Sequence, residues 1–158
     1  MDKYTYNLLV EPSGRNYENL LDFALGECKF FLLVTAGNNK QLSPRGKEVL
    51  NQLTPFLYKM EMKLEWPGTI LLRNAVPVYT YHFVQDSVEI LKSSTEGLYQ
   101  WQRPDLPDDL CLLRFDESPW LVTIAHESDS YFELTEEEMD RLVKALPAYA
   151  SIIQISGK

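Results

Sequence analysis

The stretch DDLCLLRFDESPWLVTIAHESDSYFELTEEE, residues 108–138, decides the fold because it combines three short strand patterns with a helix start. Apolar runs at residues 110–115 and 120–126 flank the turn Asp-Glu-Ser-Pro and predict a β-hairpin. Both alternating faces of this hairpin are largely apolar, so we expect it near the centre of a sheet. A second turn, residues 127–130, leads into a third strand over residues 131–134.

The pairing of these strands decides which side chains meet. We expect Phe115 to oppose Trp120 and His126 to oppose Tyr131. One face of the ribbon then gathers, toward one end, four side chains with acid–base or nucleophilic chemistry: Cys111, His126, Tyr131 and Glu133. The opposite face carries Leu, Thr, Ala and Phe side chains and is the better candidate to receive helices.

Helix signals occur elsewhere along the chain. Apolar residues recur at helical spacing over residues 17–25, with Asn16 as the expected cap. Ser43-Pro44 is a strong helix start, and that helix should end between Thr54 and Leu57 because Pro55 interrupts it. A short helix is expected over residues 86–92. The sequence Thr135-Glu-Glu-Glu138 is a capping box that begins a last helix.

Further strands are expected on both sides of the hairpin. Residues 28–35 form a buried apolar run, and residues 4–8, 76–84 and 150–155 also have strand character, the first as an edge strand. Residues 58–66 alternate cleanly, which predicts that Tyr58, Met60, Met62, Leu64 and Trp66 point into the core while Lys and Glu face water. Pro67-Gly68 turns the chain back over residues 69–73, and residues 36–42 (AGNNKQL) read as a polar loop without the spacing of a phosphate-binding loop.

These elements predict a single α+β domain spanning residues 1–158. Its mainly antiparallel sheet should have about six or seven strands, with about three or four helices mostly on one face. No apolar run is long enough to span a membrane, and the first residues lack the apolar region of a signal peptide. The two cysteines, Cys28 and Cys111, lie in apolar runs and are expected as buried free thiols, so the cytoplasm is the expected compartment.

The charge is unevenly distributed. The chain carries a formal net charge of −8, and residues 105–140 contain 12 acidic residues against one basic residue, Arg114. Such a segment repels nucleic-acid backbones and favours a basic protein partner. We therefore expect a partner-binding surface composed of Asp116, Glu117, His126, Glu127, Asp129, Tyr131 and Glu133. An ordinary coincidence of acidic turns with an acidic helix start is the alternative explanation.

Catalytic and metal chemistry receive less support from the sequence. Cys111 and His126 lie within reach in the expected pairing, but burial among leucines raises a thiol pKa rather than activating it. His126, Glu127 and Asp129 offer nitrogen and oxygen ligands, but no paired-histidine, zinc or EF-hand spacing is present. No cofactor and no metal are therefore expected. A small-ligand or metal-binding enzyme that uses Cys111, His126, Tyr131 and Glu133 stays open as an alternative, as does a self-associating domain.

A resemblance adds to this picture. The run PDLPDDL at residues 104–110, the Ser-Pro-Trp-Leu of residues 118–121 and the Ile-Ala-His-Glu of residues 124–127 resemble a family of small bacterial cytosolic proteins. That family has no established activity, so the resemblance implies no site residues. In size and acidity the chain is also similar to immunity proteins, which neutralise toxins. Together these observations favour a non-catalytic interaction domain for a basic partner.

Overall fold

The structure is a computed structural model that describes residues 1–35 and 42–157. The predicted polar loop lies outside these residues apart from Leu42. The described residues contain four α-helices: α1 (Arg15–Ala24), α2 (Pro44–Leu53), α3 (Gln85–Ser94) and α4 (Glu136–Ala145). Their strands are β1 (Tyr4–Leu8), β2 (Phe30–Val34), β3 (Leu57–Lys63), β4 (Glu65–Trp66), β5 (Thr69–Ile70), β6 (Val76–His82), β7 (Asp108–Leu113), β8 (Pro119–Ile124), β9 (Asp129–Leu134) and β10 (Ile153–Gly157).

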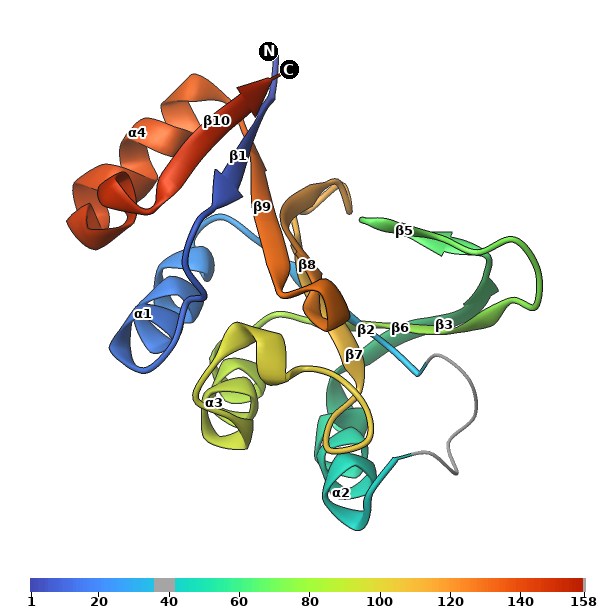
Figure 1. Ribbon diagram of the computed structural model, residues 1–158. Coiled ribbons are helices and arrows are strands. Elements are labelled where there is room, and N and C mark those ends of the chain that lie inside the picture. Colours follow the sequence, from blue (N-terminus) through green and yellow to red (C-terminus); the bar gives the residue numbers. More distant parts are fainter. Residues whose placement is uncertain (36–41, 158) are drawn as a thin grey trace.

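One antiparallel sheet organises the molecule (Figure 1). Its eight strands run in the order β10-β1-β9-β8-β7-β2-β6-β3, and β4 pairs with β5 in a separate two-stranded sheet. The α+β class, the antiparallel sheet and the helix number are therefore confirmed, and β7 and β8 lie near the centre as predicted. The main sheet has eight strands, slightly more than the six or seven predicted. β1 is not an edge strand, since it lies between β9 and β10.

The helices share one core against one face of the sheet. Leu21 of α1, Leu53 of α2, Leu91 of α3 and Leu142 of α4 are all buried in this helix-side core. The sheet contributes Phe31 and Leu33 of β2, and also five residues of the face that the sequence assigned to helices: Leu110, Leu112, Leu121, Phe132 and Leu134. The predicted caps also form, because Gly46 N bonds Ser43 Oγ at 3.1 Å and Glu138 N bonds Thr135 Oγ1 at 3.1 Å. By contrast α1 begins after Gly14, not after Asn16.

A second, smaller core lies on the other face of the sheet. This hairpin-side core contains Trp66 together with Leu32, Val34, Val76, Val78, Cys111, Leu113 and Val122. The β4–β5 hairpin approaches β8 so closely that a Cβ on Gly68 would lie 2.8 Å from Val122 Cγ1. The backbone of Gly68 also has a φ of 89°, which residues other than glycine rarely adopt. The Pro67-Gly68 turn is thus fixed both by its conformation and by this packing.

The prediction for residues 58–66 is wrong about burial. Met60 is 48% exposed and Met62 is 59% exposed, and of the five predicted core residues only Trp66 is buried. Met60 pairs with Tyr79 and Met62 with Pro77 on the helix side of β6, but β3 is the last strand of the sheet. An irregularity between Leu57 and Lys59 breaks the alternation, so Tyr58 contacts Phe30 and His82 on the other face.

Candidate functional site

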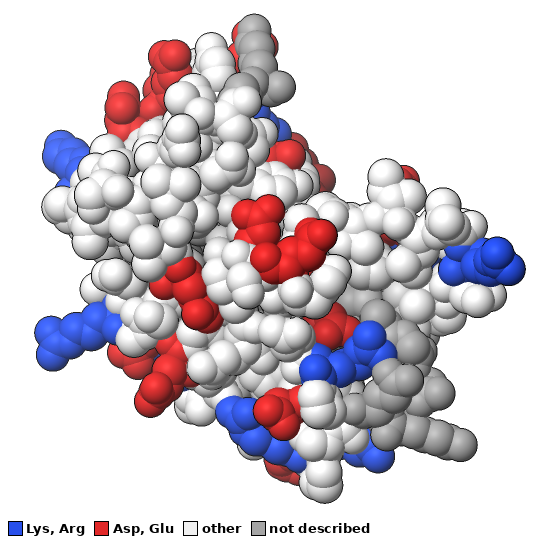
Figure 2. Space-filling model, viewed as in Figure 1, with Lys and Arg blue, Asp and Glu red and all other residues white. Residues whose placement is uncertain are grey.

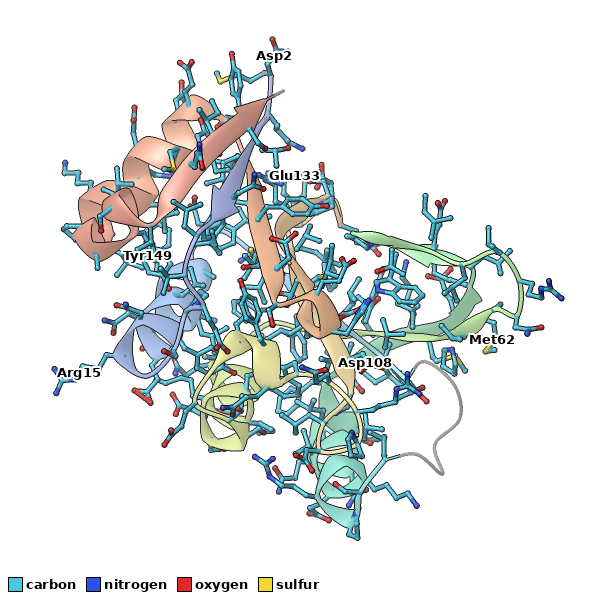
Figure 3. All side chains as sticks on the ribbon, viewed as in Figure 1. Asp2, Arg15, Met62, Asp108, Glu133 and Tyr149 are labelled. Carbon is cyan, nitrogen blue, oxygen red and sulfur yellow. The ribbon has the colours of Figure 1, made fainter. Side chains whose placement is uncertain are left out.

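The predicted partner-binding residues do not form one surface. Asp116 and Glu117 lie in the turn before β8, whereas His126, Glu127 and Asp129 lie at its other end. A six-residue strand separates its ends by roughly 20 Å. Tyr131 pairs with Val122 near the middle of β8, and Glu133 lies beyond it toward the first end. Figure 3 shows the separation, with Glu133 labelled far from Asp108, which lies at the second end.

The expected strand register is also wrong. Val122 opposes Tyr131 and Ile124 opposes Asp129, so His126 has no strand partner. The reason is the turn, because η4 (Ala125–Glu127) is a 3₁₀ helix and Ser128 adopts the left-handed conformation with a φ of 52°. At the other turn Leu112 opposes Leu121 and Leu113 opposes Pro119. This shift directs Trp120 to the helix-side core, where its ring contacts Phe132 at 5.2 Å between centroids.

Basic residues of the chain itself accompany the acids at the Asp116 end. Lys59 Nζ lies 2.7 Å from Glu117 Oε1, and Lys3 Nζ lies 3.4 Å from Ser118 Oγ in the same turn. Asp116 accepts hydrogen bonds from the hydroxyl and the backbone N–H of Ser118, which lower the pKa of its carboxyl. This end of β8 therefore offers a weaker attraction to a cationic partner than its sequence suggests.

Arg114 joins this end of the sheet to α4. Its Nε and Nη2 donate to the two carboxylate oxygens of Glu138 at 2.8 Å each, and Nη2 also donates to the carbonyl of Glu133 at 2.5 Å. Burial alone would raise the pKa of the Glu138 carboxyl, but hydrogen bonds from Arg114 and Thr135 outweigh it and hold that pKa below its usual value. The acidic start of α4 is thus partly structural.

The thiol of Cys111, which the enzyme alternative would use, is inaccessible. Cys111 is fully buried, and burial raises the pKa of its thiol to about 12. Tyr131 packs beside the hairpin-side core that contains Cys111, whereas His126 lies at the β8–β9 turn. His126 therefore lies apart from Cys111, Tyr131 and Glu133, which interact electrostatically with one another, and a thiolate at neutral pH is disfavoured.

A carboxylate that the sequence did not single out is the most unusual group at the His126 end. Asp109 has a φ of 59° and is only 3% exposed. Its Oδ1 accepts the backbone N–H of Ala125 at 3.0 Å, and its Oδ2 accepts the indole N–H of Trp66 at 3.2 Å. Burial raises the pKa of this carboxyl despite both hydrogen bonds. Asp109 thus connects β7, the β4–β5 hairpin and the β8–β9 turn.

These elements surround a hollow of about 370 Å³, which we call the acidic hollow. Asp108, Asp109, Trp66 and Arg103 line it, together with Thr69, Leu71, Gln102 and His126. Arg103 donates to Asp108 from its backbone N–H and from Nε, each at 2.9 Å. Glu127 and Asp129, both exposed, lie in the adjacent turn.

The distribution of charge on the surface is dispersed. On the face shown in Figure 2, acidic side chains occur in several separate groups, and some of them lie beside basic ones. Among the residues that the structure describes, no three histidine, cysteine, aspartate or glutamate side chains are arranged to hold a metal ion. None of the helices in residues 1–35 and 42–157 has the length and apolar character needed to cross a bilayer.

Comparison with known proteins gives no match, since no family model, no curated protein and no solved structure is significantly similar to this chain. The resemblance seen over residues 104–127 stays a prediction. One part of that segment nevertheless acquires a structural role, because it supplies Asp108 and Asp109 to the acidic hollow. A sequence signal for Asp109 was absent, since its partner Trp66 lies 43 residues away along the chain.

Proposed function

We propose that the protein is a non-catalytic interaction domain that binds a basic protein through the β8–β9 turn and the acidic hollow. The observation that carries the proposal is the hollow itself, where Asp109, Trp66 and the Arg103–Asp108 ion pair lie beside the exposed acids Glu127 and Asp129. Neutralisation of a basic toxin, as immunity proteins perform it, is one form that this binding takes.

The hollow suits the side chain of a lysine or arginine. Each oxygen of Asp109 accepts one hydrogen bond within the protein, and a carboxylate oxygen has two lone pairs, so each retains acceptor capacity. An indole face attracts a cation within about 6 Å of its centre. Asp129 and Glu127 at the rim add long-range attraction that speeds encounter with a positive surface.

The seven residues expected from the sequence therefore contribute unequally to the proposed surface. His126, Glu127 and Asp129 belong to it by position, and Tyr131 lies two residues further along β9. Asp116, Glu117 and Glu133 lie toward the other end of β8, where Lys59, Lys3 and Arg114 reduce the local negative charge. We propose that Asp116, Glu117 and Glu133 contribute less to binding than the residues at the His126 end, or not at all.

Short oligo-arginine and oligo-lysine peptides provide a direct test by isothermal titration calorimetry at low salt. Asp129→Lys should weaken binding about threefold to tenfold, because reversal of one exposed charge changes binding by about 1 kcal/mol. Asp140→Lys on α4 makes the same change in net charge at a distance from the hollow and should leave binding unchanged. Weakening by Asp116→Lys but not by Asp129→Lys would place the surface at the other end of β8 and contradict the proposal.

A small cationic ligand is the second candidate occupant, because a volume of about 370 Å³ is within the range of small-molecule sites. Trp66 lines the hollow, so amine binding should change its fluorescence. Thermal-shift and fluorescence screening with amines and guanidines of low molecular weight would separate the two candidates. Tight binding of a free amine with no binding of the peptides would favour the small ligand over a protein.

A further inference from the structure

The outer edge of the sheet carries an apolar surface that residues 1–35 and 42–157 leave exposed. Met60 and Met62 of β3 are about half exposed, and Leu64, Ile70 and Leu72 beside them are 47%, 76% and 98% exposed. In Figure 3, Met62 is labelled on the outer part of the arm formed by β3 to β6, away from the helices. Proteins usually protect such an edge with short strands, prolines or charges; β3 carries charges, but it has seven residues and an exposed methionine face.

The backbone of β3 is free to pair on its outer side. In an antiparallel strand, successive residues direct their N–H and C=O groups to alternate sides. Thr35 N donates to Pro77 O at 3.2 Å, so Pro77 directs its backbone toward β2 and its neighbours Val76 and Val78 direct theirs toward β3. The partners of Val76 and Val78 are Lys63 and Glu61, which leaves the backbone groups of Met60 and Met62 directed outward.

The charges of β3 are complementary to those of a second copy of the same strand. Lys59, Glu61 and Lys63 alternate in sign along the face of β3 opposite the methionines, and Glu65 follows the bend at Leu64 as the first residue of β4. If a second copy pairs antiparallel about a two-fold axis at Met62, Glu61 opposes Lys63 of the second copy and Lys63 opposes its Glu61. Met62 then opposes itself, and Met60 opposes Leu64. The same strand is therefore complementary to itself both in charge and in apolar character.

Other registers are less favourable. An axis at Glu61 or Lys63 would place like charges directly opposite each other, which destabilises a strand pair. An axis at Met60 would pair Glu61 with Lys59, but Lys59 Nζ already contacts Glu117 Oε1 of its own chain at 2.7 Å. An axis at Leu64 would be limited because the chain leaves β3 there and the carbonyl of Leu64 already accepts the N–H of Leu71 at 2.7 Å. The register centred on Met62 pairs Glu61 with Lys63 twice across the axis and leaves the contact of Lys59 with Glu117 in place.

We propose that two copies of this chain associate through antiparallel pairing of their β3 strands, centred on Met62, so that one sheet continues across both copies. The interface is isologous, and its closed symmetry limits the assembly to a dimer. A groove of about 460 Å³ between α2 and the β3–β6 pair, lined by Leu50, Leu57, Tyr79 and Tyr81, adjoins the methionine side of the interface. This surface does not depend on the acidic hollow.

A charge swap tests both the association and its register. Sedimentation of the whole protein at several concentrations should show a monomer–dimer equilibrium in the micromolar range. Glu61→Lys should raise the dissociation constant about tenfold or more, because each copy then presents two like charges across the axis, at residues 61 and 63. The double variant Glu61→Lys with Lys63→Glu restores opposite charges about Met62 and should restore the dimer.

The double variant separates the proposed register from its nearest competitor. With the axis at Met60, the new lysine at residue 61 would still oppose Lys59, so the swap would not restore association. Asp129→Lys serves as a charge-change control and should leave the dimer intact, and thermal unfolding of each variant checks that it folds. A wild-type chain that remains monomeric at high micromolar concentration would overturn the proposal, as would a dimer that Glu61→Lys does not weaken or that the swap fails to recover.

Discussion

Replacement of Arg114 by methionine is the most informative perturbation of this structure. The guanidinium makes a bidentate contact with Glu138, at 2.8 Å for each bond, and also reaches the backbone carbonyls of Glu133 and Pro119 at 2.5 Å. The two side chains of the ion pair are only 10% and 13% exposed. Methionine keeps most of the aliphatic stem, so Arg114→Met removes the charge and its hydrogen bonds with little change in packing.

Arg114→Met lowers the free energy of unfolding because the Glu138 carboxylate is left without its charged partner. Loss of one partner from a buried ion pair costs about 3–5 kcal/mol, because the other charge stays in a poorly solvated site. Glu138 is shielded but lies near the surface, where water partly compensates, so we take the lower end and expect a loss of about 3 kcal/mol. Domains of this size are stable by about 5–15 kcal/mol, so Arg114→Met should remove a large part of the free energy of unfolding.

Urea unfolding with a double-mutant cycle measures this directly. Glu138→Gln should cost less than Arg114→Met, since the amide oxygen can still accept a hydrogen bond and the remaining Arg114 charge keeps its bonds to the carbonyls of Glu133 and Pro119. The double variant Arg114→Met with Glu138→Gln should be more stable than the sum of the single losses predicts, by about 1–2 kcal/mol. A loss below about 1 kcal/mol for Arg114→Met would refute the view that this pair holds α4 to the sheet.

The pH dependence gives an independent check. Because the pKa of Glu138 is lower in the folded protein than its ordinary value of 4.5, the pair contributes fully above that pH. Its contribution is lost as the pH falls through the folded-state pKa. The stability difference between wild type and Arg114→Met should therefore shrink on acidification below about pH 4.5.

Three further predictions concern other buried polar groups. Burial raises the pKa of the Asp109 carboxyl, so Asp109 contributes most to stability below its ordinary pKa of 3.8 and less as the pH rises. In urea unfolding, the stability of Asp109→Asn relative to wild type should therefore improve between about pH 4 and pH 7. Thr135→Ala removes the N-cap of α4 and should lower the free energy of unfolding by about 1 kcal/mol, measured by thermal denaturation. Cys111, fully buried with a pKa raised to about 12, should not react with a thiol reagent at neutral pH until denaturant is added; rapid reaction of the native protein would contradict the observed burial.

Local signals in the sequence predicted the elements well. Ser43-Pro44 and the Thr135–Glu138 capping box fix helix starts through contacts within one turn, so the sequence contains all the information needed. The apolar character of both faces of β7 likewise predicted its position inside the sheet. These are properties of neighbouring residues, and they do not depend on where distant strands lie.

Long-range placement was the part that could not be predicted. The alternation of residues 58–66 shows a strand with an apolar face, but it does not show that α2 leaves Met60 and Met62 uncovered. The register of β8 and β9 depends on the left-handed Ser128, which has no strong sequence signal. The buried contact of Asp109 forms only because the fold brings Trp66 to it. The predicted acidic surface is split in two because successive hairpin turns lie at opposite ends of a strand.

The position of β1 inside the sheet has a consequence for the order of folding. β7, β8 and β9 are neighbours both in the sequence and in the sheet, so two short loops suffice to bring them together. β1 instead inserts between β9 and β10, and Tyr6 pairs with Phe132 about 125 residues later, which requires a large loss of chain entropy. We expect amide protection to spread outward from the β7–β9 meander and to reach β1 and β10 last, so hydrogen exchange in the native protein should be fastest along that margin.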